Sequence, residues 1–291
     1  MVPPPGSRSS PSSTRRLRAA LAAAPAWLIL CLAGCNCDGN TLCKAFNSAA
    51  TSSTSTAGSA AGIWTGTDSA TNLELTGYID ANGQADFIRS DGVQFTGTAQ
   101  VSGTTVNISL SGYTQYGYEF SDGSAFGTGT FSGTVASGST LSGSVDFTTA
   151  DDTTIDGSWS LTFDSLYDTA SSLDAISGTY TDNLAAVTDG VDPLNATSLT
   201  ISSDGVLYAQ GSADGCVANG TVTVVSASAD VYQVSYTLAN CTGSDAVLNG
   251  VDFSGLAELN TDASPQALVL AVTGTSSSGA YYSIASELSG S

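Results

Sequence analysis

Few side chains in this sequence offer chemistry, and its six cysteines are the most reactive of them. The 291 residues include no histidine, which removes histidine bases and histidine metal ligands. No Gly-x-Ser-x-Gly or Ser-x-x-Lys motif supplies an activated serine. The four glutamates and the scattered aspartates form no identifiable carboxyl pair for glycoside hydrolysis. We therefore expect that this protein is not an enzyme. A carboxylate-dependent hydrolase is kept as the second of two alternative functions.

The N-terminus combines positive charge with a short apolar run that ends near a cysteine. Four arginines lie before position 20, and the run Ala19–Leu32 has 14 residues, fewer than the roughly 20 that a membrane-spanning helix needs. A basic segment followed by such a run is typical of a secretory signal. The next residues complete the segment Leu32-Ala33-Gly34-Cys35, which resembles the lipobox of bacterial lipoproteins. The resemblance implies that residues 1–34 are a signal peptide and that Cys35 becomes the acylated first residue of the mature protein.

The same resemblance implies a location. In the enteric pattern, a residue other than Asp after the acylated cysteine directs a lipoprotein to the outer membrane, and here that residue is Asn36. We therefore expect a lipid-anchored protein of the bacterial cell envelope, in the outer membrane, which contacts the membrane through acyl chains on Cys35. A plain secretory signal that ends in a cysteine and a membrane-anchored helix are the alternatives.

The sequence after the signal is strongly acidic. From Cys35 onward, 257 residues carry 26 acidic and 2 basic side chains, a formal balance of 2 − 26 = −24. Nucleic-acid binding needs clustered Lys and Arg, so nucleic acid is excluded as a partner. We expect a non-enzymatic structural or binding role, and the sequence does not identify the protein or ligand partner.

Residues 35–61 are predicted to form the acylated N-terminus and a flexible tether. Between Lys44 and Ala61 the chain is almost entirely Ser, Thr, Ala and Gly, with little apolar pattern. Chains of this composition behave as flexible coils. The tether is expected to hold the rest of the protein clear of the lipid headgroups.

Four more cysteines are available for disulfides once the signal is removed: Cys37, Cys43, Cys216 and Cys241. The oxidising cell envelope favours disulfides, and sequence proximity favours the pairs Cys37–Cys43 and Cys216–Cys241. A thiolate metal site is the alternative, although the Cys-x-Cys-x5-Cys spacing at the N-terminus matches no common zinc site.

A predicted hairpin supports the second of these pairs. Cys216 and Cys241 are equally distant from a turn at Ser228–Ala229, and the segments between them alternate as strands do. Strict alternation places the two cysteines one position out of register with the strand faces. We therefore expect one β-bulge in the hairpin, with Gly220 as the candidate.

The sequence from residue 62 onward has the turns and strands of antiparallel sheets. Asp-Gly and Asn-Gly dipeptides recur, and they supply the positive φ angles that tight hairpin turns require. Apolar and polar residues alternate between them, as in Val93–Val101 and Tyr232–Leu238. Such alternation places one face of a sheet against a core and the other in water. Short helices are expected only at 165–176 and 182–190, so the predicted fold class is all-β.

The body also repeats itself at an offset of 122 residues. Asn82-Gly83 corresponds to Asp204-Gly205, and Phe131-Ser132-Gly133 corresponds to Phe253-Ser254-Gly255. We therefore predict two tandem antiparallel β-meander units of about eight strands each. Glycines on the apolar faces favour closure of each unit into a small barrel or clam, and a sandwich is the alternative. The predicted units are residues 62–174 and residues 175–291.

Each unit opens with a glycine followed two residues later by a large aromatic residue. In the first unit this is Gly62-x-Trp64, which is similar to the opening of lipocalins, and in the second it is Gly178-x-Tyr180. The resemblance implies a carrier of a small apolar ligand, which is the first alternative function. A lipocalin packs an Arg from a late strand over this Trp, whereas Arg89 lies in an early strand. Without that Arg, Trp64 is better explained as a plug of the core than as a marker of a ligand pocket.

The densest group of aromatic residues is the candidate ligand-binding site. It consists of Tyr113, Tyr116, Tyr118 and Phe120. These side chains would suit a stacking platform for sugars or for an apolar partner. The alternative is a hairpin in which aromatic residues pair across two strands.

Two groups of acidic residues are candidates for a cation site, although we expect no cofactor and no metal centre. One is Asp151-Asp152 with Asp156, and the other is Asp80-x-Asn82-x-x-x-Asp86. Both offer the oxygen ligands that Ca²⁺ prefers, but neither follows the full calcium-loop pattern. Most of these acids also lie where turns favour Asp. A structural Ca²⁺ remains an alternative.

Overall fold

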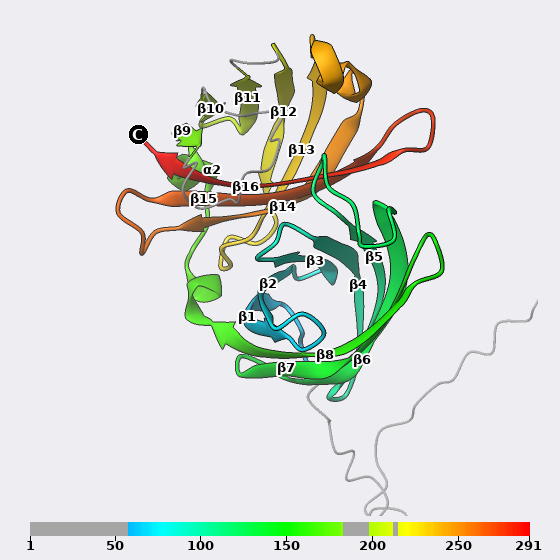
Figure 1. Cartoon of the computed structure of the whole chain (residues 1–291). Coiled ribbons are helices and arrows are strands. Elements are labelled where there is room, and N and C mark those ends of the chain that lie inside the picture. The colour runs from blue at the N-terminus through cyan, green and yellow to red at the C-terminus, as the bar shows by residue number, and fades with distance from the viewer. Residues whose placement is uncertain (1–57, 183–197, 212–214) are drawn as a thin grey trace, which may run out of the picture. The chain divides into compact units, whose positions relative to one another are not determined.

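The computed structural model describes residues 58–182, 198–211 and 215–291, and these residues form an all-β structure (Figure 1). Two antiparallel sheets of eight strands each close into barrels that follow one another along the chain. Closure confirms the predicted barrels over the sandwich. The predicted signal peptide, Cys35, the Cys37–Cys43 pair and most of the predicted tether lie outside the described residues.

The first barrel pairs each strand with the next in sequence, and its last strand closes on its first. Its strands are β1 (Gly62–Asp68), β2 (Leu73–Ile79), β3 (Gln84–Arg89), β4 (Gln94–Ser102), β5 (Thr105–Tyr113), β6 (Phe126–Ala136), β7 (Thr140–Thr149) and β8 (Thr154–Asp164). The inward positions carry large aromatic side chains that fill the core, including Trp64, Phe87, Phe131 and Trp159.

The second barrel has the same order, and β9 closes it by pairing with both β10 and β16. Its strands are β9 (Gly178–Asp182), β10 (Ser198–Ile201), β11 (Val206–Gln210), β12 (Val217–Val224), β13 (Tyr232–Ala239), β14 (Asp252–Asn260), β15 (Ala267–Thr275) and β16 (Tyr281–Gly290). Along β13 the alternation read from the sequence is confirmed, because Tyr232, Val234, Tyr236 and Leu238 are buried and the residues between them are exposed.

Two short helices connect the barrels where the sequence predicted a helix. They are η1 (Ser165–Asp168) and α2 (Leu173–Ile176). The side chains of Asp164 and Ser172 accept backbone N–H groups at their starts, as capping residues do. A third, η2 (Gly243–Leu248), was not predicted, and nearly all of the helix expected at 182–190 lies outside the described residues. In the part of the chain that the structure describes, no helix has the length and apolar character needed to span a membrane.

The sequence repeat corresponds to equivalent positions in two similar barrels. The indole of Trp64 donates a hydrogen bond to the carbonyl oxygen of Ala60 at 2.9 Å, and the hydroxyl of Tyr180 donates to that of Ile176 at 2.7 Å. In both cases the acceptor lies four residues earlier, and the aromatic ring is buried. The Gly-x-aromatic opening therefore plugs the same end of each barrel.

Glycines on the inner faces allow neighbouring strands to curl tightly. A Cβ atom on Gly97 of β4 would collide with the carbonyl oxygen of Ser109 on β5. Gly220 occupies the equivalent place on β12, where a Cβ atom would collide with the carbonyl oxygen of Ser235 on β13. These positions tolerate no side chain, as the barrel prediction required.

The Cys216–Cys241 disulfide is present, but the predicted bulge at Gly220 is wrong. β12 and β13 pair without interruption from Val217↔Ala239 to Val224↔Tyr232, and Gly220 lies opposite Tyr236. The one-residue offset of the cysteines is absorbed beyond the ladder, at Asn240, whose φ of 60° is in the left-handed region. Asn tolerates this conformation better than most residues, so the strand faces stay in register.

The two barrels pack against each other through their outer faces, and together they form one compact part of the chain. An apolar cluster at this contact combines Ile63 and Tyr78 of the first barrel with Leu256 of β14, and Leu166 and Val231 complete it. At another part of the contact, the backbone N–H of Tyr116 donates to the carbonyl oxygen of Ser283 on β16 at 2.9 Å. We call this region the barrel contact.

Candidate functional site

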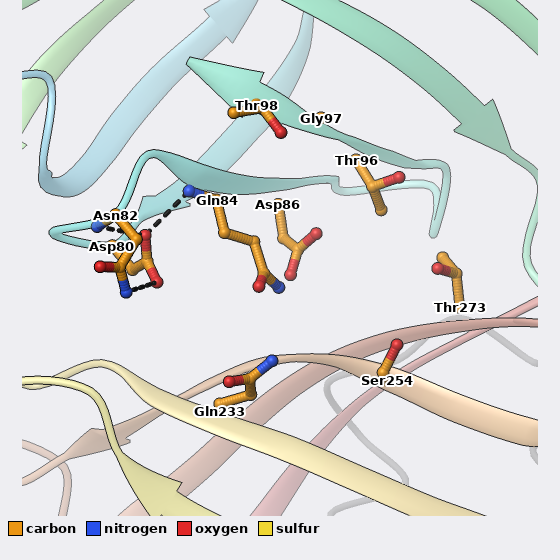
Figure 2. Close-up of a pocket in the computed structure, with 10 residues that line it drawn as sticks. All are labelled: Asp80, Asn82, Gln84, Asp86, Thr96, Gly97, Thr98, Gln233, Ser254 and Thr273. Carbon is orange, nitrogen blue, oxygen red and sulfur yellow. Dashed lines mark hydrogen bonds between the residues drawn. The ribbon is translucent and has the colours of Figure 1, made fainter. Parts of the chain in front are cut away.

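A polar cavity of about 490 Å³ lies between the barrels at the edge of the barrel contact (Figure 2). The first barrel contributes Asp80, Asn82, Gln84, Asp86, Thr96, Gly97 and Thr98, and the second contributes Gln233, Ser254 and Thr273. The side chains of Gln84 and Asp86 point from β3 toward the strands that carry Gln233 and Ser254 (Figure 2). The cavity is therefore lined by carboxyl, amide and hydroxyl groups from both barrels.

Closure of each barrel determines which side chains reach this cavity. Alternate residues of β3 point inward, where Ala85 and Phe87 are fully buried in the core. Gln84 and Asp86 alternate with these two residues along the strand, so their side chains must point outward. The same alternation turns Ser254 outward on β14, next to the inward Phe253.

Asp80 shapes one side of the cavity through its turn between β2 and β3. Its carboxylate accepts the backbone N–H groups of Asn82 and Gln84, both at 2.8 Å, and also the side-chain amide of Asn82 at 3.2 Å. Gly83, with a φ of 86°, completes the turn. Asp80 thus fixes the backbone on which Gln84 and Asp86 stand.

Asp86 is the buried acid of the cavity. Asp86 is only 3% exposed, and its Oδ2 atom has no hydrogen-bond partner. Burial raises the pKa of Asp86 to about 7 because it disfavours the charged form; the Gln84 side chain and the Leu256 backbone N–H act in the opposite direction. Asp86 therefore changes charge near neutral pH.

A second group of acids lies inside the barrel contact. Burial raises the pKa of Glu258 to about 7, against the effect of a hydrogen bond with Tyr78, and the nearby acids Asp230, Asp164 and Glu287 raise it further. Burial also raises the pKa of Asp230 to about 7, although its carboxylate accepts the backbone N–H of Leu259. The pKa of Tyr78 is raised well above its usual value by burial and by Glu258. The barrel contact thus favours protonated carboxyls.

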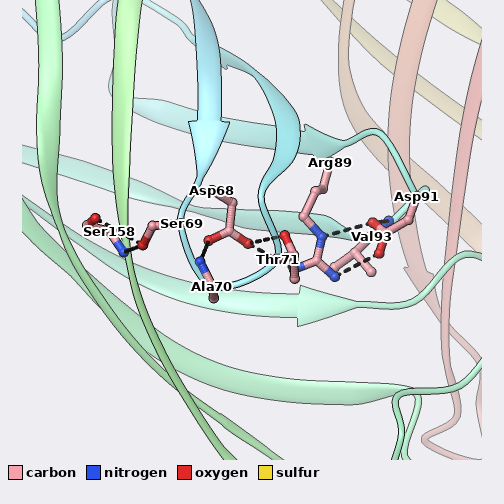
Figure 3. Close-up of polar contacts among 8 residues, drawn as sticks. All are labelled: Asp68, Ser69, Ala70, Thr71, Arg89, Asp91, Val93 and Ser158. Atoms are coloured by element: carbon pink, nitrogen blue, oxygen red, sulfur yellow. Dashed lines mark hydrogen bonds and ion pairs between the residues drawn. The ribbon is translucent and has the colours of Figure 1, made fainter.

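Arg89 pairs with two acids at one end of the first barrel (Figure 3). Its guanidinium lies 3.0 Å from the carboxylate of Asp68 and 2.9 Å from that of Asp91, and the pair with Asp68 is buried. The guanidinium also lies over the ring of Phe95, 5.9 Å from its centre. It does not cover Trp64 as in a lipocalin, since the ring that packs edge-on against Trp64 is that of Phe163.

The four aromatic residues of the predicted stacking platform are dispersed. Tyr113 pairs across strands with Phe126, and Tyr281 of the second barrel stacks on Phe126 at 4.0 Å between ring centres. Tyr116 extends to the second barrel, where its hydroxyl donates to Asp245 at 3.1 Å. Phe120 packs against Phe147 in the core, and Tyr118 is exposed. Tyr113 and Tyr116 thus contribute to the barrel contact instead of a shared platform.

The two acidic groups predicted from the sequence have different surroundings. Asp80, Asn82 and Asp86 do come together at the cavity. Asp151 and Asp152 lie exposed in the turn between β7 and β8, and Asp156 follows on β8. Within the described ranges, no three acidic or cysteine side chains are grouped closely enough to bind a metal ion together.

The second-barrel residues of the cavity were missed by the sequence reading. Gln233, Ser254 and Thr273 are polar residues at outward positions, as dozens of others are in this chain. The alternation shows that they point outward, but it carries no signal for which outer faces meet.

Comparison with known proteins gives no relative for this chain: no protein-family model, no curated protein and no solved structure matches it.

Proposed function

We propose that this chain is a lipid-anchored lipoprotein of the bacterial cell envelope, in the outer membrane, whose double barrel has a non-enzymatic binding role. The lipobox-like segment at Cys35 and the Ser/Thr-rich stretch after it support the anchor. The observation that carries the binding role is the polar cavity of about 490 Å³, which needs both barrels to form its wall.

The barrel interiors favour this role over that of an apolar carrier. In the first barrel, Trp64, Phe131 and Trp159 are at most 2% exposed and occupy the space that a carrier would leave for its ligand. The second barrel is filled in the same way by Tyr232, Phe253 and the aliphatic residues around them. Polar outer faces, and the cavity between them, are left as the surfaces for recognition.

Metabolic labelling with a palmitate analogue tests the anchor in the full chain. We expect the wild type to carry the label in the membrane fraction and Cys35→Ala to lose it. Cys31→Ala is the matched control, since it removes a cysteine from the predicted signal peptide and should leave labelling unchanged. Retention of the label by Cys35→Ala, or recovery of an unmodified wild type from the culture medium, would contradict the proposal.

A further inference from the structure

We infer that the cavity between the barrels binds a small organic cation, an amine carried on a hydroxyl-bearing chain, with Asp86 as the partner of the ammonium group. This inference rests on the proposed binding function and names the chemical class of its ligand. It follows from the charge of the cavity wall, from the mixture of hydrogen-bonding groups on it, and from its size.

The wall is acidic and has no basic residue among the ten that line it. Arg89 is the one basic side chain in the described ranges, and its guanidinium is paired with Asp68 and Asp91. Asp86 therefore has no basic side chain of the described ranges as its partner, and its Oδ2 atom accepts no hydrogen bond. A buried carboxylate without a counter-charge is destabilising. A cationic ligand that supplies this charge should therefore bind favourably, whereas an anionic ligand should be repelled.

The rest of the wall suits hydroxyl groups. Three amide side chains, Asn82, Gln84 and Gln233, each offer donors and an acceptor. Four hydroxyl side chains add groups that both donate and accept, namely Thr96, Thr98, Ser254 and Thr273. A ligand hydroxyl needs both functions from its surroundings, and this wall provides them on both barrels.

The size of the cavity favours a small molecule over a bare metal ion. A volume of about 490 Å³ lies in the range of small-molecule sites, roughly 300–1,000 Å³. A Ca²⁺ site instead needs about six to eight oxygens that converge to within roughly 2.6 Å of one point. The described residues contain no group of three metal-ligating side chains, and the Asp80 carboxylate is already bonded within its own turn.

Three polyhydroxy compounds that share a six-carbon chain and differ at one end test the inference by calorimetry on the full chain in detergent. N-methyl-D-glucamine carries the cation, sorbitol is neutral, and gluconate is anionic. We expect the amine to bind best, sorbitol more weakly and gluconate not measurably. Equal binding of the amine and sorbitol, or no heat from any of the three, would overturn the inference.

Asp86→Asn is the variant that removes the proposed charge while keeping the shape of the side chain. It should weaken binding of the amine by about tenfold or more, as expected for loss of a charge-assisted hydrogen bond. Asp156→Asn is the matched control, because it removes one exposed acid of the same barrel outside the cavity. Unchanged affinity in Asp86→Asn would overturn the inference.

The pH dependence of amine binding is a second readout, which a purely structural effect of the Asp86→Asn substitution would not reproduce. Because the pKa of Asp86 is about 7, the amine should bind about tenfold more tightly at pH 8 than at pH 6 in the wild type. No such change is expected in Asp86→Asn.

A second variant keeps the test decisive if Asp86→Asn does not fold. Thr98 is exposed at the edge of the cavity, so Thr98→Lys should fold and place an ammonium group of its own there. It should abolish binding of the amine, and unchanged binding would count against the inference. Palmitate labelling is independent of all these outcomes, so a failed ligand site and a failed anchor are distinguishable.

Discussion

In both barrels a backbone hydrogen bond joins the end of the third strand to the residue just before the fourth, but different side chains stabilise this region. In the first barrel the backbone N–H of Arg89 donates to Val93, and in the second that of Gly211 donates to Cys216. Beside this shared hydrogen bond, the first barrel pairs the Arg89 side chain with Asp68 at the end of β1. The second barrel instead links Cys216 to Cys241.

The two solutions differ in what they depend on. An ion pair buried in the barrel requires both partners to stay charged, whereas a disulfide requires an oxidising surrounding. The aromatic plug, the glycines on the inner faces and the turn hydrogen bonds are common to both barrels. The shared features are therefore those that the barrel topology requires, whereas the ion pair and the disulfide are specific to one barrel each.

Replacing Arg89 should have the largest effect, and it should be confined to the first barrel. Arg89→Met leaves Asp68 buried without its cation, and we expect a loss of about 3–5 kcal/mol in the free energy of unfolding. Of the three Trp residues, Trp64 and Trp159 lie in the first barrel and Trp27 lies in the predicted signal peptide. In the mature protein, Trp fluorescence in urea should therefore report the first barrel.

Asp91→Asn is the control for this experiment, since the side chain of Asp91 is 39% exposed and its pair with Arg89 contributes less. An Arg89→Met protein whose fluorescence transition matches that of the wild type would show that the ion pair does not stabilise the first barrel.

Removing the disulfide should destabilise the second barrel alone. The link spans 25 residues, and the double variant Cys216→Ala, Cys241→Ala should lose about 3 kcal/mol through the entropy of the unfolded chain. Far-ultraviolet circular dichroism reports both barrels, so its urea transition should separate from the unchanged fluorescence transition. A fluorescence midpoint that moves with the dichroism would mean that the two barrels unfold as one unit.

The same hairpin shows how far the sequence could be read. Proximity and alternation identified the cysteine pair and both strands, because a disulfide and a period of two are local properties. The position of the offset was wrong, since the sequence offers glycine as the usual site of irregular backbone and the chain uses Asn240. Gly220 is needed for close packing of β12 on β13, a requirement that only the closed barrel makes visible.

The cavity was predictable only in part. The short spacing from Asp80 to Asp86 brought these residues together in the sequence reading, because one turn and one strand connect them. The opposite wall comes from residues at least 147 positions after Asp86, the nearest being Gln233 (233 − 86 = 147). Their encounter depends on how two closed barrels pack, and polar outward residues carry no signal for that.

The barrel contact should make the protein less stable as pH rises. The pKa of Glu258 is about 7 in the folded protein and near 4.5 when unfolded, so the folded state binds more protons between these values. Stabilisation by the protonated carboxyl is complete below about pH 4.5 and is lost as pH rises to about 7, with an upper limit near 3 kcal/mol. Asp86 and Asp230, whose pKa values are also about 7, add in the same direction.

Glu258→Gln isolates this contribution from other titrating groups. The difference in free energy of unfolding between wild type and variant, measured in urea at pH 5 and pH 8, should shift in favour of the variant at pH 8. Glu74→Gln, which changes an exposed glutamate on β2, should show no such shift. A wild type that gains stability relative to Glu258→Gln as pH rises would show that the carboxylate is not destabilising at the barrel contact.

The aromatic plugs allow the most direct comparison of the two barrels, and they include the smallest effect, that of Tyr180→Phe. Tyr180→Phe removes one hydroxyl and its hydrogen bond to Ile176, which should lower the free energy of unfolding by about 1–2 kcal/mol. Trp64→Phe removes the bond to Ala60 and part of a fully buried ring, so the loss should be larger, about 2–4 kcal/mol. Dichroism should detect both changes, and Trp159 fluorescence only the second. Equal losses in the two variants would mean that the hydrogen bond to the residue four positions earlier, and not the size of the ring, determines how each plug stabilises its barrel.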